Sequence, residues 1–291
     1  MRVIESFIRG KYADQSLCED GIVIGTGIVA VIDGVTSRGK LRWRGGTGGR
    51  FAKDVLCAYI MEHEDELVHL TAVECMRTLN CVLAEKREEV HPGSIAITEY
   101  PRACIILYNS EAREVWRYGD CQCMIGGERH CEGKEVDRLL SELRSFIIRS
   151  GIRERQEAET GRGESGPPAQ LTENGAVDAG REAILPLIEK QLWFENTPGP
   201  FGYPVLNGRN FAEEMVSVLP VPDGAEVILA TDGYPQLCAA LQESEERLRK
   251  IIEEDPLCIG VNAGTKGIME GMESFDDRAF VRAVQLRNLT Y

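Results

Sequence analysis

Two apolar runs joined by a glycine-rich turn constrain the fold more than any other feature of this chain. Residues 21–24 and 28–32 are short and rich in Ile and Val, and only the Gly-Thr-Gly sequence of residues 25–27 separates them. β-Branched residues in runs of this length favour strands, and a turn of this kind is typical of a tight connection between antiparallel strands. The sequence therefore predicts a β-hairpin over these residues.

Acidic residues mark the open end of the predicted hairpin. Glu19 and Asp20 come just before its first strand, and Asp33-Gly34 directly follows its second strand. A hairpin places the start of its first strand beside the end of its second, so the three carboxylates are expected to crowd together. Like charges at short range repel unless one is protonated or a cation lies between them. The pattern favours a cation.

Three more acids stand at the ends of other apolar runs. Asp120 and Asp232 each follow a predicted strand, and Asp276 precedes the last predicted strand. Asp-Gly is also a common turn pair, and Asp223-Gly224 is interpreted as a plain turn because no apolar run leads into it. Carboxylates that converge from several strands are ligands that Mg²⁺ and Mn²⁺ prefer. The sequence therefore predicts a binuclear metal site.

Composition and charge exclude several classes of function. The formal net charge of −14 argues against a nucleic-acid partner, since phosphate backbones bind basic patches. No apolar stretch approaches the roughly 20 residues that span a membrane, so no membrane partner is expected. The ten cysteines include no C-x-x-C pair, and without a signal peptide they predict a cytoplasmic protein. A zinc site of Cys121, Cys123, His130 and Cys131 is a less favoured alternative, because its spacing fits no usual pattern.

The order of elements predicts an α+β fold. Strands are expected over residues 21–24, 28–32, 103–108, 114–118, 121–125, 216–219, 226–230 and 279–286, and helices over 51–60, 71–89, 132–152, 183–192 and 235–252. This mixed order favours packed layers of antiparallel sheet and helix in a single domain, residues 1–291. Residues 153–181 are polar and rich in Gly and Glu, which predicts a flexible insertion because such a segment buries little.

The acidic motifs, taken in order, resemble those of a known family. They are Cys18-Glu19-Asp20-Gly21, Val31-Ile32-Asp33-Gly34, Gly119-Asp120, Ala230-Thr231-Asp232-Gly233 and Asp276-Asp277. Their order and spacing resemble the metal-dependent protein phosphatases, the PPM or type 2C Ser/Thr phosphatases, especially the bacterial branch. The resemblance implies a four-layer α-β-β-α sandwich, in which two antiparallel sheets are flanked by helices and metals lie at one edge.

The resemblance also implies a set of metal ligands, which are Glu19, Asp20, Asp33, the Gly34 carbonyl, Asp120, Asp232 and Asp276. Asp33 would bridge two Mn²⁺ or Mg²⁺ ions and so be the catalytic residue that positions the nucleophilic water. Glu19 and Gly34 would serve the second ion. Asp232 and Asp276 would hold the first ion, and Asp120 together with Asp232 would hold a weaker third ion. A water shared by two cations loses a proton near neutral pH and attacks phosphorus in line.

One part of the family pattern is missing. Gln15 stands where the family has an arginine that binds the substrate phosphate. Arg9, Lys11 or a basic loop could replace it. The loop is favoured, and its candidates for phosphate binding are Arg38, Lys40, Arg42 and Arg44. The leading hypothesis is a phosphatase that acts on phosphoserine or phosphothreonine in a protein partner. The alternatives are a phosphatase of a small phosphoester and a non-catalytic regulatory module with the same fold.

Overall fold

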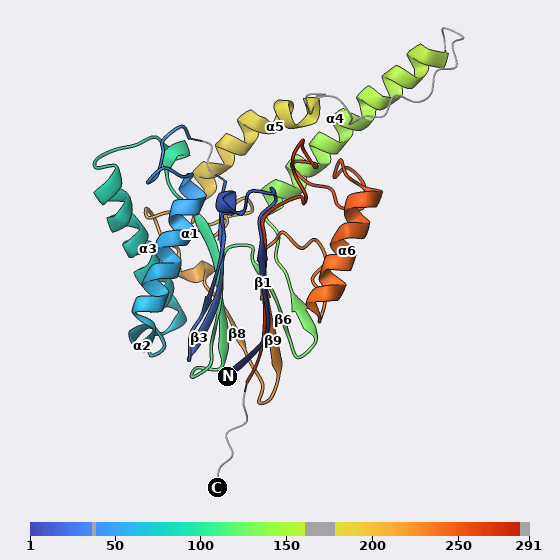
Figure 1. Ribbon diagram of the computed structural model, residues 1–291. Coiled ribbons are helices and arrows are strands. Elements are labelled where there is room, and N and C mark those ends of the chain that lie inside the picture. The colour runs from blue at the N-terminus through green and yellow to red at the C-terminus, as the bar shows by residue number, and fades with distance from the viewer. Residues whose placement is uncertain (37–38, 161–177, 286–291) are drawn as a thin grey trace.

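The centre of the molecule consists of two antiparallel five-stranded sheets (Figure 1). The computed structural model describes residues 1–36, 39–160 and 178–285. The first sheet has the strand order β1-β10-β9-β6-β7, and the second has the order β2-β3-β4-β5-β8. The strands are β1 (Arg2–Arg9), β2 (Asp20–Ile24), β3 (Ile28–Gly34), β4 (Ala103–Asn109), β5 (Glu114–Tyr118), β6 (Gln122–Ile125), β7 (Glu128–His130), β8 (Ser217–Pro220), β9 (Glu226–Ala230) and β10 (Arg278–Val284).

Helices cover the outer faces of both sheets. The α-helices of the described chain are α1 (Gly48–Glu62), α2 (Glu64–Leu67), α3 (Ala72–Val90), α4 (Glu135–Thr160), α5 (Ala179–Lys190) and α6 (Leu241–Glu254). In Figure 1, α1 and α3 flank one sheet, and α6 flanks the other. The predicted four-layer α-β-β-α sandwich is therefore confirmed.

The burial of both faces of β3 explains why the sequence of this strand is apolar almost throughout. Ile28, Ala30 and Ile32 pack against the side chains of α1 and α3. Val29 and Val31 point the other way, into the core between the two sheets. Side chains alternate between the two faces of a strand, and both faces of β3 are buried. The same alternation carries the next odd-numbered residue, Asp33, to the edge of the core between the sheets.

The predicted hairpin is confirmed, and its register brings the acids together. β2 pairs with β3 so that Asp20 lies opposite Asp33 and Ile24 lies opposite Val29. At the closed end, the carboxylate of Glu64 accepts hydrogen bonds from the backbone N–H of Gly27 at 2.6 Å and Ile28 at 2.8 Å. These bonds satisfy turn donors that neither strand can pair.

β1 and β7 were not predicted from the sequence. β1 is an edge strand that pairs only with β10, with Arg9 opposite Arg278 and Arg2 opposite Val284. Its residues are alternately exposed and partly buried, so no continuous apolar run reveals it. β7 has only three residues, which is too short for a periodic signal.

Helices α4 and α5 form a separate layer at one end of the sandwich. Their contact is apolar, with Leu140 of α4 against Ile184 and Ile188 of α5. Of the predicted insertion, residues 153–160 belong to α4 and 179–181 to α5, while 161–177 lie outside the described residues.

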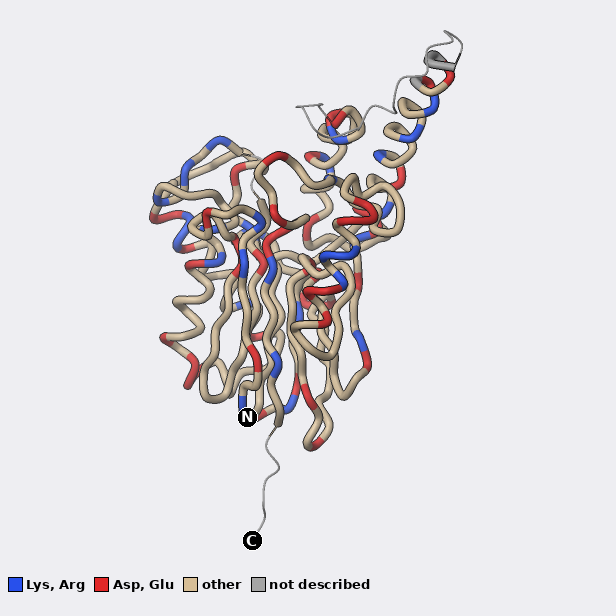
Figure 2. The backbone as a smooth tube through the Cα atoms, turned by 45° about the vertical axis from the view of Figure 1, so that its right-hand side comes forward, with Lys and Arg blue, Asp and Glu red and all other residues tan. Residues whose placement is uncertain are grey.

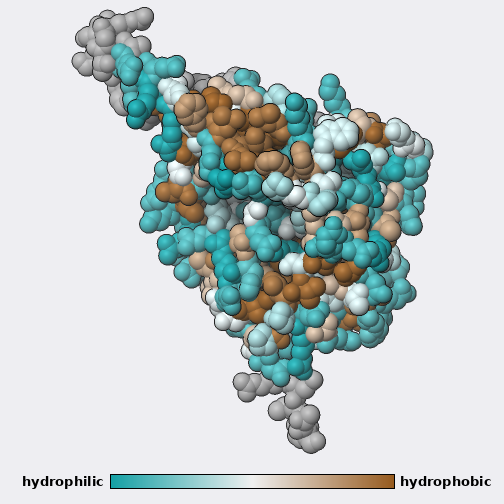
Figure 3. All heavy atoms as spheres, turned by 180° about the vertical axis from the view of Figure 1, so that it is seen from behind, coloured by the Kyte–Doolittle hydropathy of each residue, from teal (hydrophilic) through white to brown (hydrophobic). Residues whose placement is uncertain are grey.

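Part of the surface beside α4 is apolar. Figure 3 shows this hydrophobic area next to the base of the projecting helix. Phe146 of α4 is 66% exposed, and Trp193, just after α5, is 67% exposed. None of the helices in the described ranges combines the length and apolar character needed to cross a bilayer.

Charged residues are interspersed over the described chain. Figure 2 shows Lys and Arg alternating with Asp and Glu along the helices and loops instead of collecting on one element. Red segments outnumber blue ones, in keeping with 47 acidic and 33 basic residues. The loops at the end of the sheets that carries the acidic motifs hold both signs of charge.

Candidate metal centre

Three carboxylates from three different strand ends converge at one edge of the sandwich. Asp33 belongs to the end of β3, Asp120 follows β5, and Asp232 follows β9. One oxygen of each lies within 4.8 Å of the others, and this is the one such group of potential ligands among the described residues. The sequence placed all three among the metal ligands, and the fold brings them together.

The position of Asp120 depends on a glycine. Gly119 has φ of +126°, a conformation that L side chains rarely adopt. A Cβ atom there would lie 2.3 Å from the Cβ of Cys104 on β4. The chain can therefore pass close to β4 at this point and turn Asp120 toward Asp33 and Asp232.

Burial and mutual repulsion both act on the carboxylates of Asp33 and Asp232. Burial raises the pKa of Asp33 well above its ordinary value, and the charges of Asp232, Asp20 and Asp120 raise it further. Burial among the loops of the site, Asp120 and Asp276 raise the pKa of Asp232 to about 7, although part of the residue is exposed to solvent. Such a group favours either protons or a cation as its neutralising charge.

Asp120 combines a paired oxygen with an unpaired one. Its Oδ2 lies 2.7 Å from Nζ of Lys134, just before α4. Burial raises the pKa of Asp120, but Lys134 lowers it more, so that the net pKa lies below the ordinary value. Among the described residues the buried Oδ1 has no hydrogen-bond partner, although the Cys104 thiol and the backbone N–H of Asp120 also lower the pKa of this carboxyl. A buried acceptor of this kind fits a divalent cation.

Gly34 is fixed by close contacts on both sides. Its N–H donates to the carbonyl of Glu19 at 3.1 Å. A Cβ atom at Gly34 would lie 2.4 Å from the carbonyl oxygen of Gly49 and 2.5 Å from that of Glu19. No side chain fits there, so the close approach of β3 to the start of α1 requires glycine.

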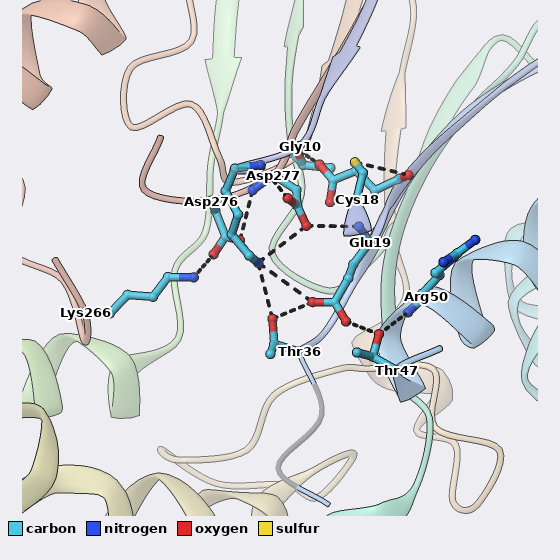
Figure 4. A network of polar contacts seen from close by, with 12 residues as sticks. Gly10, Cys18, Glu19, Thr36, Thr47, Arg50, Lys266, Asp276 and Asp277 are labelled. Atoms are coloured by element: carbon cyan, nitrogen blue, oxygen red, sulfur yellow. Dashed lines mark hydrogen bonds and ion pairs between the residues drawn. The ribbon is translucent and has the colours of Figure 1, made fainter. Parts of the chain in front are cut away.

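Glu19 is buried and held by hydroxyl groups. Its Oε1 accepts a hydrogen bond from Thr47 at 2.5 Å, and its Oε2 accepts one from Thr36 at 2.6 Å. Thr47 is also the N-cap of α1, where its hydroxyl accepts from the N–H of Arg50. In Figure 4 the Arg50 side chain points away from Glu19. The Glu19 carboxylate is therefore oriented by the start of the helix.

Two lysines neutralise Asp276. Nζ of Lys11 lies 2.7 Å from Oδ1 of Asp276, and Nζ of Lys266 lies 2.5 Å from Oδ2. Figure 4 shows Glu19, Asp276 and Asp277 gathered around one point, with Lys266 approaching from the opposite side. Burial raises the pKa of Asp276, but the two ammonium groups lower it more, and the net pKa is well below the ordinary value.

Asp20 has a different environment from the other acids. It is buried, and its Oδ2 accepts a hydrogen bond from the hydroxyl of Thr231 at 2.7 Å. The Thr231 hydroxyl in turn accepts from the N–H of Ala279. Asp20 thus links the hairpin to β9 and β10 across the core, and burial raises its pKa well above the ordinary value.

The predicted phosphate-binding loop lies over α1 and α3. Lys40 and Arg42 are exposed, and Arg38 lies outside the described residues. Arg44 packs over the ring of Phe51 at 5.7 Å and borders a pocket of about 390 Å³ between the loop and α1. The lining of that pocket includes none of the clustered carboxylates.

The alternative zinc set does not assemble. Cys121 and Cys123 are buried, and Cys131 is exposed. Cys123 pairs across the strands with His130, but no three of the four residues form a group of potential ligands in the described structure. All ten cysteines are free thiols.

Several residues that shape the site were missed by sequence reasoning. Lys134, Lys266 and Asp277 were not assigned to it, and neither were the three threonines that bind Glu19 and Asp20. Single lysines and threonines in loops carry no periodic signal, and their partners lie up to 265 residues away in the sequence, as for Lys11 and Asp276. Sequence reasoning considered Lys11 as a possible phosphate contact, but not as a partner of the acids.

Comparison with known proteins finds similarity in structure only. No family model matches the chain, and no curated protein matches it in sequence. The serine/threonine phosphatase PstP of Mycobacterium tuberculosis is 14% identical, covers 98% of this chain and 100% of its own, and has a TM-score of 0.47. The PPM Ser-Thr phosphatase MsPP of Mycobacterium smegmatis is 12% identical over 98% of this chain and 100% of its own, with a TM-score of 0.42.

Two further solved structures are similar to this chain, one with bound metal ions and one of a photosystem II phosphatase. The catalytic domain of PstP was solved with 2 manganese ions. The photosystem II phosphatase PBCP is 11% identical, covers 99% of this chain and 100% of its own, and has a TM-score of 0.45. The solved structures to which this chain is similar along nearly its whole length are thus mostly PPM-type Ser/Thr phosphatases.

Proposed function

We propose that the chain is a metal-dependent phosphoester hydrolase of the PPM type that removes phosphate from phosphoserine or phosphothreonine in proteins. The observation that carries the proposal is the convergence of Asp33, Asp120 and Asp232, one oxygen of each within 4.8 Å of the others. The buried, unpaired Oδ1 of Asp120 supports it independently. Mn²⁺ or Mg²⁺ suits such a set of carboxylate oxygens.

The residues divide into two candidate positions for cations. Asp33, Asp120 and Asp232 form the first position. Glu19 and the Gly34 carbonyl, with Asp276 nearby, are the candidates for a second. When bound, a divalent cation lowers the pKa of water toward neutrality and offsets the charge on phosphoryl oxygens. The carboxylates fix where that charge lies, because Asp120 and Glu19 are held by Lys134 and by two threonine hydroxyls.

Hydrolysis assays test this proposal. We expect the purified protein to hydrolyse p-nitrophenyl phosphate and a phosphothreonine peptide with Mn²⁺, and to lose both activities with a chelator. Asp33→Asn should lower turnover by several orders of magnitude, since it removes a central negative charge. Asp223→Asn is the matched control, because Asp223 also precedes a glycine but pairs on the surface with Arg113. Activity that survives the chelator or Asp33→Asn would contradict the proposal.

One observation favours a second candidate, a non-catalytic regulatory module. Lys11, Lys134 and Lys266 neutralise Asp276 and Asp120 without any metal. A protein with this fold could therefore keep its acids for stability and bind a phosphorylated partner without cleaving it. Binding of the phosphothreonine peptide with no release of phosphate in Mn²⁺ would support this candidate. Cleavage of the small ester alone would indicate a small phosphoester as the substrate.

A further inference from the structure

The ammonium group of Lys11 occupies a site made of oxygens. Its Nζ lies 2.7 Å from Oδ1 of Asp276, 3.4 Å from Oδ2 of Asp277 and 3.7 Å from Oε2 of Glu19. The hydroxyl of Thr36 is also 3.4 Å away. Only 7% of the Lys11 side chain is exposed. Three carboxylates and a hydroxyl around a buried point are a set of ligands that would equally suit a divalent cation.

The backbone fixes Lys11 in this place. Its N–H donates to Oδ1 of Asp277 at 2.7 Å, and its carbonyl accepts from the N–H of Glu273 at 2.7 Å. The other oxygen of Asp277 accepts from the N–H of Glu19 at 3.0 Å. Asp277 therefore joins the backbones of Lys11 and Glu19, and the lysine side chain has little freedom to leave the carboxylates.

The charges differ between the two candidate cation positions. Around Lys11, two ammonium groups, of Lys11 and Lys266, face the carboxylates of Glu19, Asp276 and Asp277. At the other position, three carboxylates have one ammonium group in direct contact, that of Lys134, while Lys266 acts on Asp232 only through its longer-range charge. A divalent cation that approached Glu19 and Asp276 would meet Lys11 at contact distance. Two positive charges at contact distance repel each other strongly, even near a protein surface.

We propose that Lys11 is a resident cation at the second position, so that the protein binds one divalent cation tightly, at Asp33, Asp120 and Asp232. This inference rests on the proposed metal centre and specifies its composition. A second metal ion enters between Glu19 and Asp276 only when Lys11 is displaced. The lysine thus supplies in the protein a positive charge that would otherwise come from solution.

Metal titration tests this inference without reference to activity. Isothermal titration calorimetry and Mn²⁺ electron paramagnetic resonance of the chelator-treated protein would give the number of ions bound and their affinities. The wild type should bind one Mn²⁺ tightly. Lys11→Met, which keeps most of the length of the side chain and removes its charge, should bind a second ion at least about tenfold more tightly than the wild type does.

Two other variants serve as controls. Lys266→Met removes one partner of Asp276 but leaves Lys11 in place, so it should still bind one tight ion. Lys250→Met removes a charge from the exposed face of α6, where Lys250 pairs with Glu254, and should titrate like the wild type. Because the wild-type stoichiometry needs no variant, the inference stays testable if Lys11→Met does not fold.

Each outcome has a distinct meaning. Two Mn²⁺ ions of comparable affinity in the wild type would overturn the inference and leave the proposed hydrolase intact. One ion in both the wild type and folded Lys11→Met would also overturn it. Binding of no ion by the wild type would overturn the metal centre itself. One ion in the wild type and two in Lys11→Met support the inference, whatever the hydrolysis assays give.

Discussion

Asp20 and Asp33 lie directly opposite each other across the β2–β3 hairpin, yet they contact different partners. Asp20 accepts a hydrogen bond from Thr231 in the core, whereas Asp33 contributes an oxygen to the cluster with Asp120 and Asp232. Like charges directly opposite in a sheet destabilise it. The hairpin therefore places two carboxylates that repel each other at the site. Asp20 is stabilised by its hydrogen bond from Thr231, whereas Asp33 lies where a cation could neutralise it.

Asp20→Asn should leave the metal-free protein at neutral pH at least as stable as the wild type. The asparagine carbonyl can still accept from Thr231, while the repulsion with Asp33 is removed. Thermal denaturation in a chelator checks this, with Asp223→Asn at an exposed turn as the control. A fall of the melting temperature by several degrees would show that the fold needs the charge of Asp20.

Gly34→Ala should destabilise the fold by about 1–3 kcal/mol or more, because overpacking forces the backbone to shift. The new Cβ would meet the carbonyl oxygens of Gly49 and Glu19. Gly133→Ala is the matched control, since nothing lies within 4 Å of a Cβ there and its φ is not in the left-handed region. Urea denaturation of both variants measures the difference. Equal stabilities would contradict the close approach of β3 to α1.

The fold was more predictable than the site. The runs that became β3, β4 and β9 are apolar because layers cover both of their faces, so the sequence alone marks them. β1 was not predicted, because in the described structure it lies at the edge of its sheet and has no continuous apolar run. The predicted helix at 235–252 begins only at Leu241, because residues before it pack irregularly, with Leu237 buried against β9 and β10.

The acids of the site could be read from strand ends, but their counter-charges could not. Asp33 and Asp232 follow apolar strands directly, so local sequence shows where they lie. Lys134 reaches Asp120, and Lys266 reaches Asp276, from loops that no pattern connects to these acids. Such contacts depend on how distant loops meet at the edge of the sheets, and only the tertiary structure determines that.

Arg144→Met should lower the free energy of unfolding by about 3 kcal/mol, the scale for breaking a buried ion pair. The Arg144 guanidinium is fully buried and binds Asp178, the N-cap of α5, and the carbonyls of Cys258 and Gly264. It therefore joins α4, α5 and the loop after α6.

Arg149→Met is the control for that variant. Arg149 lies on the same helix, and within the described part of the chain it donates only to the carbonyl of Ile259, at an exposed position, so the loss should stay below about 1 kcal/mol. Urea denaturation measures both variants. Similar losses in the two would show that Arg144 has no special role in holding α4 and α5.

Glu245→Gln should reduce stability at neutral pH by about 1–3 kcal/mol. Glu245 of α6 accepts hydrogen bonds from Arg278 at 2.7 and 2.9 Å and from the Tyr234 hydroxyl at 2.7 Å. Burial raises the pKa of Glu245, but these bonds lower it more, so the folded-state pKa lies below the ordinary value.

The sign of the pH dependence follows from that lowered pKa. The carboxylate stabilises the fold fully above the unfolded-state pKa of about 4.3, and the contribution is lost as the pH falls through the folded-state pKa. The gap between wild type and Glu245→Gln should therefore close in acid. Urea titrations from pH 7 to about pH 3 would show it. Glu246→Gln, at an exposed site where Gln242 is the one hydrogen-bond donor among the described residues, should show no such change.

The basic loop before α1 is the source that we expect for the phosphate contact, in place of the missing arginine. The loop before α1 is held by its backbone: the N–H of Lys40 donates to Glu99, and the carbonyl of Arg42 accepts from His91. The side chains of Lys40 and Arg42 are exposed and make no ion pair with any described residue. They are therefore free to meet an anionic substrate, whereas Arg44 is stacked on Phe51.

Neutralising Lys40 and Arg42 should raise KM for a phosphothreonine peptide by roughly tenfold or more, the scale of one lost charge-assisted hydrogen bond of about 1.5–3 kcal/mol. Turnover at saturation should change less, because the carboxylates that position the metal are untouched. Arg44→Met should have a smaller effect on KM than either of the other two changes. Steady-state kinetics with the peptide and with p-nitrophenyl phosphate measure these values. If KM for both substrates is unchanged when all three are neutralised, these three residues do not bind the phosphate, and the contact must come from elsewhere in the chain.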